Sequence, residues 1–334
     1  MSEGPPPRHY FQCTAPDRAM YAIGKHQPSS IHVRVDLHGL LDAERLALAW
    51  RRLPELHPIL GCTLPHPALR PRWRPGRSAP RELVETSETA PSQTEAPGPA
   101  ELRLLNEALD VRRGPPARLA LLRRPDATHR LLLSVHHAAM DARATVNVAN
   151  AVNELYGALA RHPEIELAPD YSLRTMREVF RQQGVRSKQR RRLARGQQGR
   201  EGRIGKSRHR DPRPQKGIAY RRGTVTYREW ILEPDVLAGL SPRRQEAGWT
   251  LNDVLLGLLA WSWARALGAG EHKRKMSAWL ATADARPWFG VQGGLGNLSG
   301  LEPVGLPGVE QADPSGAVAI AHSAMAECKA GRLG

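Results

Sequence analysis

The residues best suited to chemistry are two adjacent histidines and an aspartate, in the stretch His136-His137-Ala-Ala-Met-Asp141. Imidazole titrates near neutral pH, so either histidine could take a proton from a hydroxyl, thiol or amine. Adjacent side chains at the end of a strand point to opposite sides, so we expect only one histidine to face a substrate. Asp141 suits the start of a helix, where the helix dipole favours a carboxylate, and it could pair with an arginine elsewhere.

Two other interpretations fit the residue types of this stretch. An ordinary turn between strand and helix could carry the same residues, with a capping aspartate and a chance pair of histidines. The composition of the chain gives about 0.02 chance occurrences of the pattern. A metal site made of His136, His137 and Asp141 is disfavoured, because the adjacent histidines diverge and no further ligand pattern accompanies them. The sequence therefore favours acid–base chemistry at one histidine.

Strands and helices alternate around these residues in the first half of the chain. The strand over residues 130–135 runs directly into the histidines, and a helix over residues 142–159 follows the aspartate. A Pro- and Arg-rich stretch, residues 65–99, is expected to be a long surface excursion with one weak strand near Leu83. Apolar patterns predict further strands over 31–37, 59–64 and 117–122, and amphipathic patterns predict further helices over 43–53 and 100–109.

The second half repeats the alternation of strand and helix. It has a predicted strand over residues 224–232, a helix over 253–267, a strand over 277–282, a Gly-rich loop over 290–300 and a helix over 316–329. Such an order predicts an α/β protein of two similar lobes, each a mixed sheet flanked by helices.

Several classes of protein are excluded by composition. The cysteines Cys13, Cys62 and Cys328 are odd in number and far apart, which supports neither a disulfide framework nor a Cys-based zinc site. The longest apolar stretch, residues 254–267, is too short to cross a bilayer. The N-terminus has no basic and apolar leader, so we expect a cytoplasmic protein.

The net charge of +16 is concentrated in one segment. Residues 174–222 hold 18 basic and 3 acidic residues, and the rest of the chain is close to neutral. Residues 182–217 lack an apolar repeat and are expected to be poorly ordered. The segment could be simply solvated, could contact nucleic-acid phosphates, or could attract an acidic carrier protein or the phosphates of coenzyme A. Nucleic acid is least favoured, because no aromatic residue lies between residues 181 and 216 to stack on bases.

The histidine pattern resembles the acyltransferase superfamily of chloramphenicol acetyltransferase, nonribosomal peptide synthetase condensation domains, and polyketide-associated and wax-ester-forming acyltransferases, which share His-His-x-x-x-Asp-Gly. Residues 37–60, ending in His57-Pro58-Ile-Leu60, resemble the first strand and helix of condensation domains. Residues 109–137 resemble the strand pair that delivers the motif, and residues 251–258 a helix of the second lobe. Ala283-Asp-Ala-Arg286 and Leu295-Gly-Asn-Leu-Ser299 resemble an arginine strand and an asparagine loop beyond it.

The resemblance implies a two-lobe sandwich like that of chloramphenicol acetyltransferase. It places an N-terminal lobe at residues 1–170, a basic linker or insertion at 171–222 and a partial C-terminal lobe at 223–334. Two departures from the family accompany it. Ala142 stands where the family usually has Gly, and family members usually continue with more strands and helices after the asparagine loop. The second lobe is therefore expected to be incomplete.

The resemblance also implies the roles of the site residues. His137 would be the general base that deprotonates the acceptor for attack on an acyl thioester, with His136 in support. Asp141 would form a structural ion pair with Arg286. Asn297 would line the substrate channel.

Ser299 would help to stabilise the oxyanion of the reaction. The donor would be acyl-CoA or a phosphopantetheinyl thioester on an acyl carrier protein, and the acceptor a small alcohol or amine, with no tightly bound cofactor and no metal. Secondary metabolism or lipid biosynthesis in a bacterium is the expected setting. The alternatives are amide-forming condensation in nonribosomal peptide synthesis, or a noncatalytic remnant that acts as a binding or scaffold protein.

Overall fold

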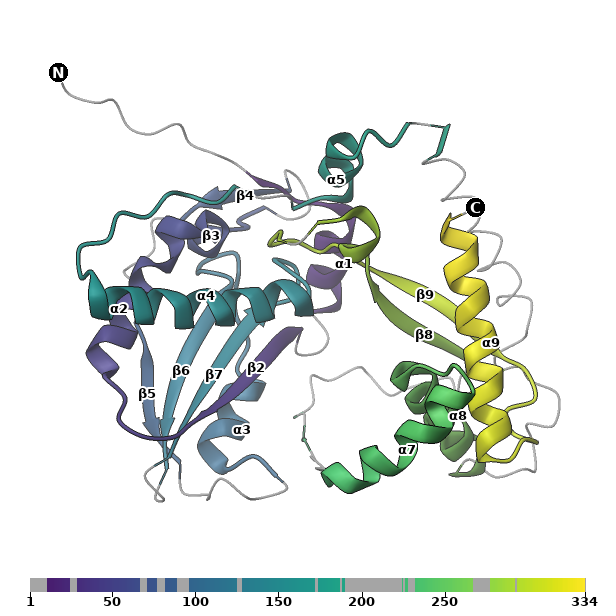
Figure 1. The fold of residues 1–334 in the computed structure, drawn as a ribbon. Helices are drawn as coiled ribbons and strands as arrows, with labels where there is room; N and C mark the ends of the chain where they lie inside the picture. The colour runs from purple at the N-terminus through teal and green to yellow at the C-terminus, as the bar shows by residue number, and fades with distance from the viewer. Residues whose placement is uncertain are drawn as a thin grey trace, which may run out of the picture. The chain divides into compact units, whose positions relative to one another are not determined.

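The computed structural model shows two compact units (Figure 1). The first takes residues 1–179, 219–229 and 285–298, and the second takes residues 180–218, 230–284 and 299–334. Most of the basic segment and most of the predicted strand over 224–232 lie outside the residues that the structure describes. The described residues are 11–24, 29–66, 71–76, 82–88, 96–124, 128–171, 174–186, 188–189, 224, 226–227, 232–266, 277–291 and 293–333.

The main sheet of the first unit has the strand order β2-β7-β6-β5. Strand β7 (His129–His136) runs antiparallel to both β2 (Ser30–Leu37) and β6 (Ala117–Arg123), and β5 (Val84–Ser87) runs parallel to β6. The strands predicted over residues 31–37, 117–122 and 130–135 are confirmed. Because side chains alternate between the two faces of a sheet, each strand contributes to two separate layers.

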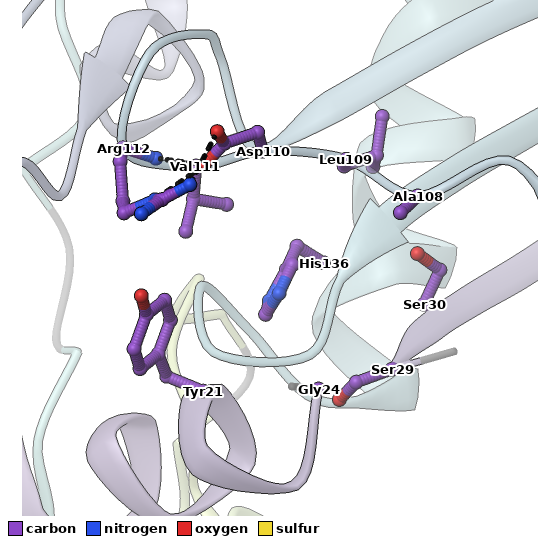
Figure 2. A pocket seen from close by; sticks show the side chains of 10 residues that line it. All are labelled: Tyr21, Gly24, Ser29, Ser30, Ala108, Leu109, Asp110, Val111, Arg112 and His136. Carbon is purple, nitrogen blue, oxygen red and sulfur yellow. Dashed lines mark hydrogen bonds and ion pairs between the residues drawn. The ribbon is translucent and has the colours of Figure 1, made fainter. Parts of the chain in front are cut away.

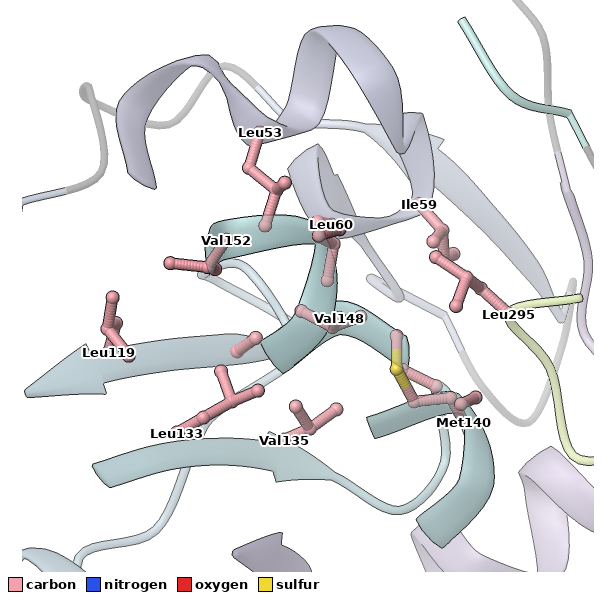
Figure 3. Close-up of a cluster of buried hydrophobic side chains, with 14 of the residues drawn as sticks. Leu53, Ile59, Leu60, Leu119, Leu133, Val135, Met140, Val148, Val152 and Leu295 are labelled. Atoms are coloured by element: carbon pink, nitrogen blue, oxygen red, sulfur yellow. The ribbon is translucent and has the colours of Figure 1, made fainter. Parts of the chain in front are cut away.

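Helices cover both faces of this sheet. The long helices α2 (Ala43–Leu56) and α4 (Ala142–Arg161) pack over one face and enclose the largest core, drawn in Figure 3. The short helix α3 (Pro99–Asn106) covers the other face. The apolar stripe of α4 fits this position, because its buried residues recur every three or four positions: Ala144, Val148, Ala151, Val152, Leu155 and Leu159.

Helix α2 is longer than predicted. The sequence predicts a helix over residues 43–53 that ends before Pro54, but the helix continues to Leu56 with Pro54 inside its last turn. A proline there removes only one hydrogen bond, and the buried Leu53 accepts the next one from the His57 N–H at 2.8 Å. The strand predicted over 59–64 is instead a 3-10 turn, Pro58–Gly61, and the two-residue β3, Cys62–Thr63.

The excursion after residue 65 contributes to the core, which the sequence did not indicate. Its strand β4 (Arg72–Pro75) lies between β1 (Phe11–Gln12) and β3 in a three-stranded sheet. Trp73 on β4 is fully buried, and its indole N–H donates to the Asp17 carboxylate at 3.4 Å. A single tryptophan between arginines and prolines has no periodicity, so composition alone assigned it to the surface.

The second unit has a two-stranded antiparallel sheet of β8 (Ser277–Asp284) and β9 (Ser299–Leu306). The helices α8 (Leu251–Ala266) and α9 (Pro314–Leu333) pack against each other. At Gly257 a Cβ would come within 2.7 Å of the Ala317 carbonyl oxygen, so only glycine allows this close approach. The predicted helices over 253–267 and 316–329 and the strand over 277–282 are confirmed.

Helix α8 is apolar on both of its sides. Val254, Gly257 and Ala260 are buried, whereas apolar residues four positions apart are exposed on the other side. A helix that is apolar all round is typical of a position covered on more than one side. No described helix is both long enough and apolar enough to cross a membrane. The exposed residues are Leu251, Leu255, Leu259 and Trp263.

Candidate functional site

The histidine stretch lies at the end of β7, where the sheet still fixes the backbone. The His136 N–H donates to the Pro116 carbonyl and the His137 N–H to the Ser29 carbonyl, each at 2.8 Å. The ladder therefore continues past the last strand residue on both sides. Helix α4 begins directly after Asp141, which is its N-cap.

The structure brings Asp141 and Arg286 together in a buried ion pair. The Arg286 guanidinium lies 3.0 Å from the Asp141 carboxylate, and both side chains are less than a tenth exposed. The carboxylate also accepts the Ala144 N–H at 3.0 Å, as an N-cap does, and the Leu298 N–H at 2.9 Å. One carboxylate thus joins the motif to a segment more than 140 residues further along the chain.

Arg286 also organises the loop that follows it. Its guanidinium donates to the carbonyls of Gly294 at 2.9 Å and Gly296 at 3.1 Å. At Gly296 an added Cβ would collide with the backbone of Arg174, so this position has no room for any side chain. The glycines that the sequence left as ordinary turn residues are therefore part of the packing around the motif.

Asn297 contacts the motif backbone. Its side-chain amide donates to the carbonyl of His137 at 2.9 Å and to the Asp17 carboxylate at 2.8 Å. A longer contact of 3.4 Å reaches the Ala138 carbonyl. Asn297 is only 6 % exposed. Its predicted place in a substrate channel stays a prediction.

Two residues of this region, Arg174 and Asp17, were not found from the sequence. Arg174 is buried, and it donates to the Ala139 carbonyl at 3.0 Å and to the Leu295 carbonyl. Burial lowers the pKa of its guanidinium, and the nearby Asp17 carboxylate counteracts this effect. The only sequence signal was the pattern Thr14-x-x-Asp17, a capping box at the start of α1 (Ala15–Ile23).

Three side chains from outside the motif therefore hold its loop, and we call Arg174, Arg286 and Asn297 the loop clamp. They supply donors to the carbonyls of residues 137–139 or to the Asp141 carboxylate. Buried carbonyls left without donors would be destabilising, so the clamp fixes one conformation of the loop.

His137 is half-buried. Its Nδ1 is buried, and among the described residues no hydrogen-bond partner lies beside it. In proteins the partner of one ring nitrogen usually determines which nitrogen carries the proton. Among the described residues, no group therefore orients the His137 ring through Nδ1.

His136 has a defined tautomer and lines a pocket (Figure 2). Its Nδ1 accepts the Ala138 N–H at 3.0 Å, which places the proton of the neutral ring on Nε2. Burial and the neighbouring His137 lower the pKa of His136 to about 4, so the ring is neutral at pH 7. The pocket has a volume of about 390 Å³, and His137 does not line it. Its other side-chain contributors include Tyr21, Ser29, Ser30, Asp110 and Arg112.

Ser299 belongs to the second unit, where it lies opposite Asp284 across the β8–β9 pair. Its predicted contribution to an oxyanion site stays a prediction.

The second unit has its own buried carboxylate, Asp253, in the first turn of α8. It accepts the Thr250 N–H at 2.9 Å and lies 2.9 Å from Nδ1 of His322 on α9. Burial alone would raise the pKa of Asp253, but the hydrogen bonds from His322 and Thr250 outweigh it and hold this pKa below its ordinary value.

Fold and motif together define an α/β protein with helices on both faces of its main sheet and the histidine pattern at the end of a strand. Residues 18–261 match the family model described as Condensation domain. Because the match covers most of the chain, the chain belongs to the condensation-domain family. No curated protein sequence matches the chain.

Solved structures agree with the family. The first condensation domain of the CDA synthetase superposes with a TM-score of 0.69 and 16 % identity, over 97 % of this chain and 74 % of that domain. SgcC5 from Streptomyces globisporus gives 0.62 and 16 %, over 91 % and 67 %. The X-domain from teicoplanin biosynthesis gives 0.60 and 19 %, over 99 % and 72 %. The predicted fold class is thereby confirmed.

Proposed function

We propose that this chain transfers an acyl group from a thioester to an amine or hydroxyl, with His137 as the general base. Membership of the condensation-domain family supports acyl or peptidyl transfer between carrier-bound substrates, so amide formation is the favoured form. The observation that carries the proposal is the loop clamp. Two buried arginines and an asparagine surround one short loop, an arrangement that is costly unless the conformation of that loop matters.

The chemistry needs only a base and a positioned thioester. The imidazole of His137 would take the proton from the acceptor nitrogen or oxygen while that atom attacks the thioester carbonyl. The tetrahedral intermediate then collapses, the carbon–sulfur bond breaks, and the imidazolium returns its proton to the departing thiolate. Asn297 would line the channel and Ser299 would donate to the oxyanion, where a positioned donor is most effective.

The donor would be an acyl carrier protein or acyl-CoA, and no tightly bound cofactor is needed. The basic segment over residues 174–222 would attract either donor, because both are negatively charged. SgcC5 was solved in complex with a naphthyl ethanediol, a compound with two hydroxyls, which supports a hydroxyl as the second type of acceptor. We propose a cytoplasmic setting for this reaction, in secondary metabolism or in lipid biosynthesis.

A noncatalytic role in binding a partner protein is the second candidate. The teicoplanin X-domain was solved in complex with OxyB, with a TM-score of 0.58 to this chain. Nδ1 of His137 has no hydrogen-bond partner among the residues that the structure describes, which also favours this candidate, because a general base is usually oriented by a partner at its second nitrogen.

A thiol-release assay separates the two candidates. The full chain is incubated with acyl-loaded carrier protein or acyl-CoA and a panel of amines and alcohols, and free thiol is measured. His137→Ala should lower the rate at least about a hundredfold, the usual contribution of a general base. His162→Ala, at the exposed end of α4, is the matched control and should keep the wild-type rate.

Equal rates for wild type and His137→Ala would rule out the proposed base. A wild-type rate no higher than that of buffer over the whole panel would favour the binding role.

A further inference from the structure

The pocket beside His136 is a candidate site that the proposed transfer does not use. It lies wholly within the first unit, between the end of α1, the start of β2 and residues 108–112 (Figure 2). His136 lines it and His137 does not. A ligand here would therefore contact the opposite side of the motif from the proposed base.

Two rings line this pocket. The centroids of Tyr21 and His136 lie 6.5 Å apart, and the ring planes differ by 29°. Tyr21 is half-exposed in the last turn of α1, so its ring is accessible to a ligand. An aromatic ligand can stack on such a ring surface.

The polar groups of the pocket favour an uncharged ligand. Asp110 and Arg112 neutralise each other through contacts of 2.9 and 3.0 Å, so neither offers an uncompensated charge. The neutral ring of His136 offers its Nε2–H as a donor, because its Nδ1 is occupied by the Ala138 N–H. Ser29 donates to the Met20 carbonyl at 3.2 Å, which leaves its oxygen free to accept.

We propose that this pocket binds an uncharged planar aromatic group, stacked on the rings of Tyr21 and His136 that line it, with a hydrogen-bonding atom at its edge. Such a group could belong to an aryl small molecule or to the adenine of a nucleotide. The two aromatic rings of the lining carry the proposal, because a saturated ring of the same carbon skeleton has no π-face to stack on them.

A pair of probes with the same skeleton tests the role of planarity. Binding of 2-naphthol and of decahydro-2-naphthol to the full chain is measured by calorimetry, and 2-naphthol should bind at least about fivefold more tightly. Adenosine forms a third arm. Binding of adenosine tighter than that of 2-naphthol also supports the site and assigns adenine as its natural group, whereas weaker binding assigns an aryl compound. Equal affinity for 2-naphthol and its saturated counterpart would overturn the proposal.

Variants locate the binding and separate it from the proposed catalysis. Tyr21→Leu should weaken binding of 2-naphthol about fivefold to tenfold, and Tyr21→Phe, which keeps the ring, should retain it. Tyr171→Leu changes an exposed tyrosine that does not line the pocket, and should bind as the wild type does. His137→Ala should also bind normally, whether or not His137 is a catalytic base. Unchanged binding in Tyr21→Leu, or lost binding in His137→Ala, would contradict the proposal.

Discussion

The helices α4 and α8 both begin beside a buried carboxylate, but the cationic partners of the two carboxylates differ. Asp141 is paired with Arg286, and both side chains are buried. Asp253 is paired with His322, whose side chain is 40 % exposed. The Asp141 pair is therefore closed off from water, whereas the Asp253 pair is open to water on the side of its histidine.

The difference in burial has an energetic consequence. Removal of one partner from an enclosed ion pair leaves a buried charge without compensation, but a half-exposed pair can be replaced by water. Loss of a partner should therefore be much more destabilising at the Asp141 pair of the first unit than at the Asp253 pair of the second. Three experiments probe the two sites.

The largest effect is expected for Arg286→Met. This change leaves the Asp141 carboxylate buried without its cation and removes the donors to Gly294 and Gly296, so the free energy of unfolding should fall by about 3–5 kcal/mol. Urea denaturation measures the difference. Arg123→Met, which breaks an exposed pair with Glu85, is the control and should change stability by less than about 1 kcal/mol. Similar losses in the two variants would remove the contrast between enclosed and exposed pairs.

A smaller loss of stability is expected for Gly296→Ala, which tests the packing of the loop that Arg286 holds. The new methyl group would meet the backbone of Arg174, and the loop must shift, at a cost of about 2–3 kcal/mol. Gly293→Ala lies three residues earlier in the same loop with no atom within 4 Å of the added methyl, and should not be destabilising. Thermal unfolding of both variants gives the comparison, and a loss shared by both would mean that the loop is not tightly packed.

The smallest effect is expected for Asp253→Asn, and it depends on pH. The pKa of Asp253 lies below its ordinary value of 3.8 in the folded protein, so its ionised form stabilises the fold above that pH. This contribution is lost as the pH falls through the folded pKa. Asp253→Asn should therefore cost about 1–2 kcal/mol at pH 7 and progressively less below about pH 4.

Denaturation of wild type and Asp253→Asn across pH 3–7 checks this prediction. Asp235→Asn, an exposed residue at the start of α7 (Pro234–Glu246), should stay within about 0.5 kcal/mol of wild type. A difference between wild type and Asp253→Asn that grows on acidification would show the wrong sign and refute the assignment.

Regular apolar periodicity made much of the fold predictable. Helix α4 and strands β6 and β7 have long, uninterrupted patterns, and these were identified within two residues of their observed ends. Strand β9 was missed, because its sequence contains two glycines and a proline and has no alternation. The family resemblance indicated Asp141 and Arg286, which no local pattern could have paired.

Arg174 and Asp17 also surround the motif, but they could not be predicted from the sequence, and the reason is physical. Arg174 stands at the start of a basic segment, where an arginine is expected to be solvated, and its burial depends on carbonyls of Ala139 and Leu295. Asp17 looks like an ordinary capping residue, and its contact with Asn297 spans 280 positions. Long-range hydrogen bonds to backbone atoms leave no trace in the types of neighbouring residues.

The segment over residues 285–298 has a consequence for how the chain reaches its native state. It belongs to the first unit, although β8 and β9 of the second unit flank it in sequence. Asp141 is paired with a residue 145 positions later, so the motif loop is complete only when residues 286–298 have folded against it. Contacts between such distant residues slow folding, because a long loop must close before any stabilisation is gained. The geometry of the motif thus depends on closing a long loop of the chain that contains much of the second unit.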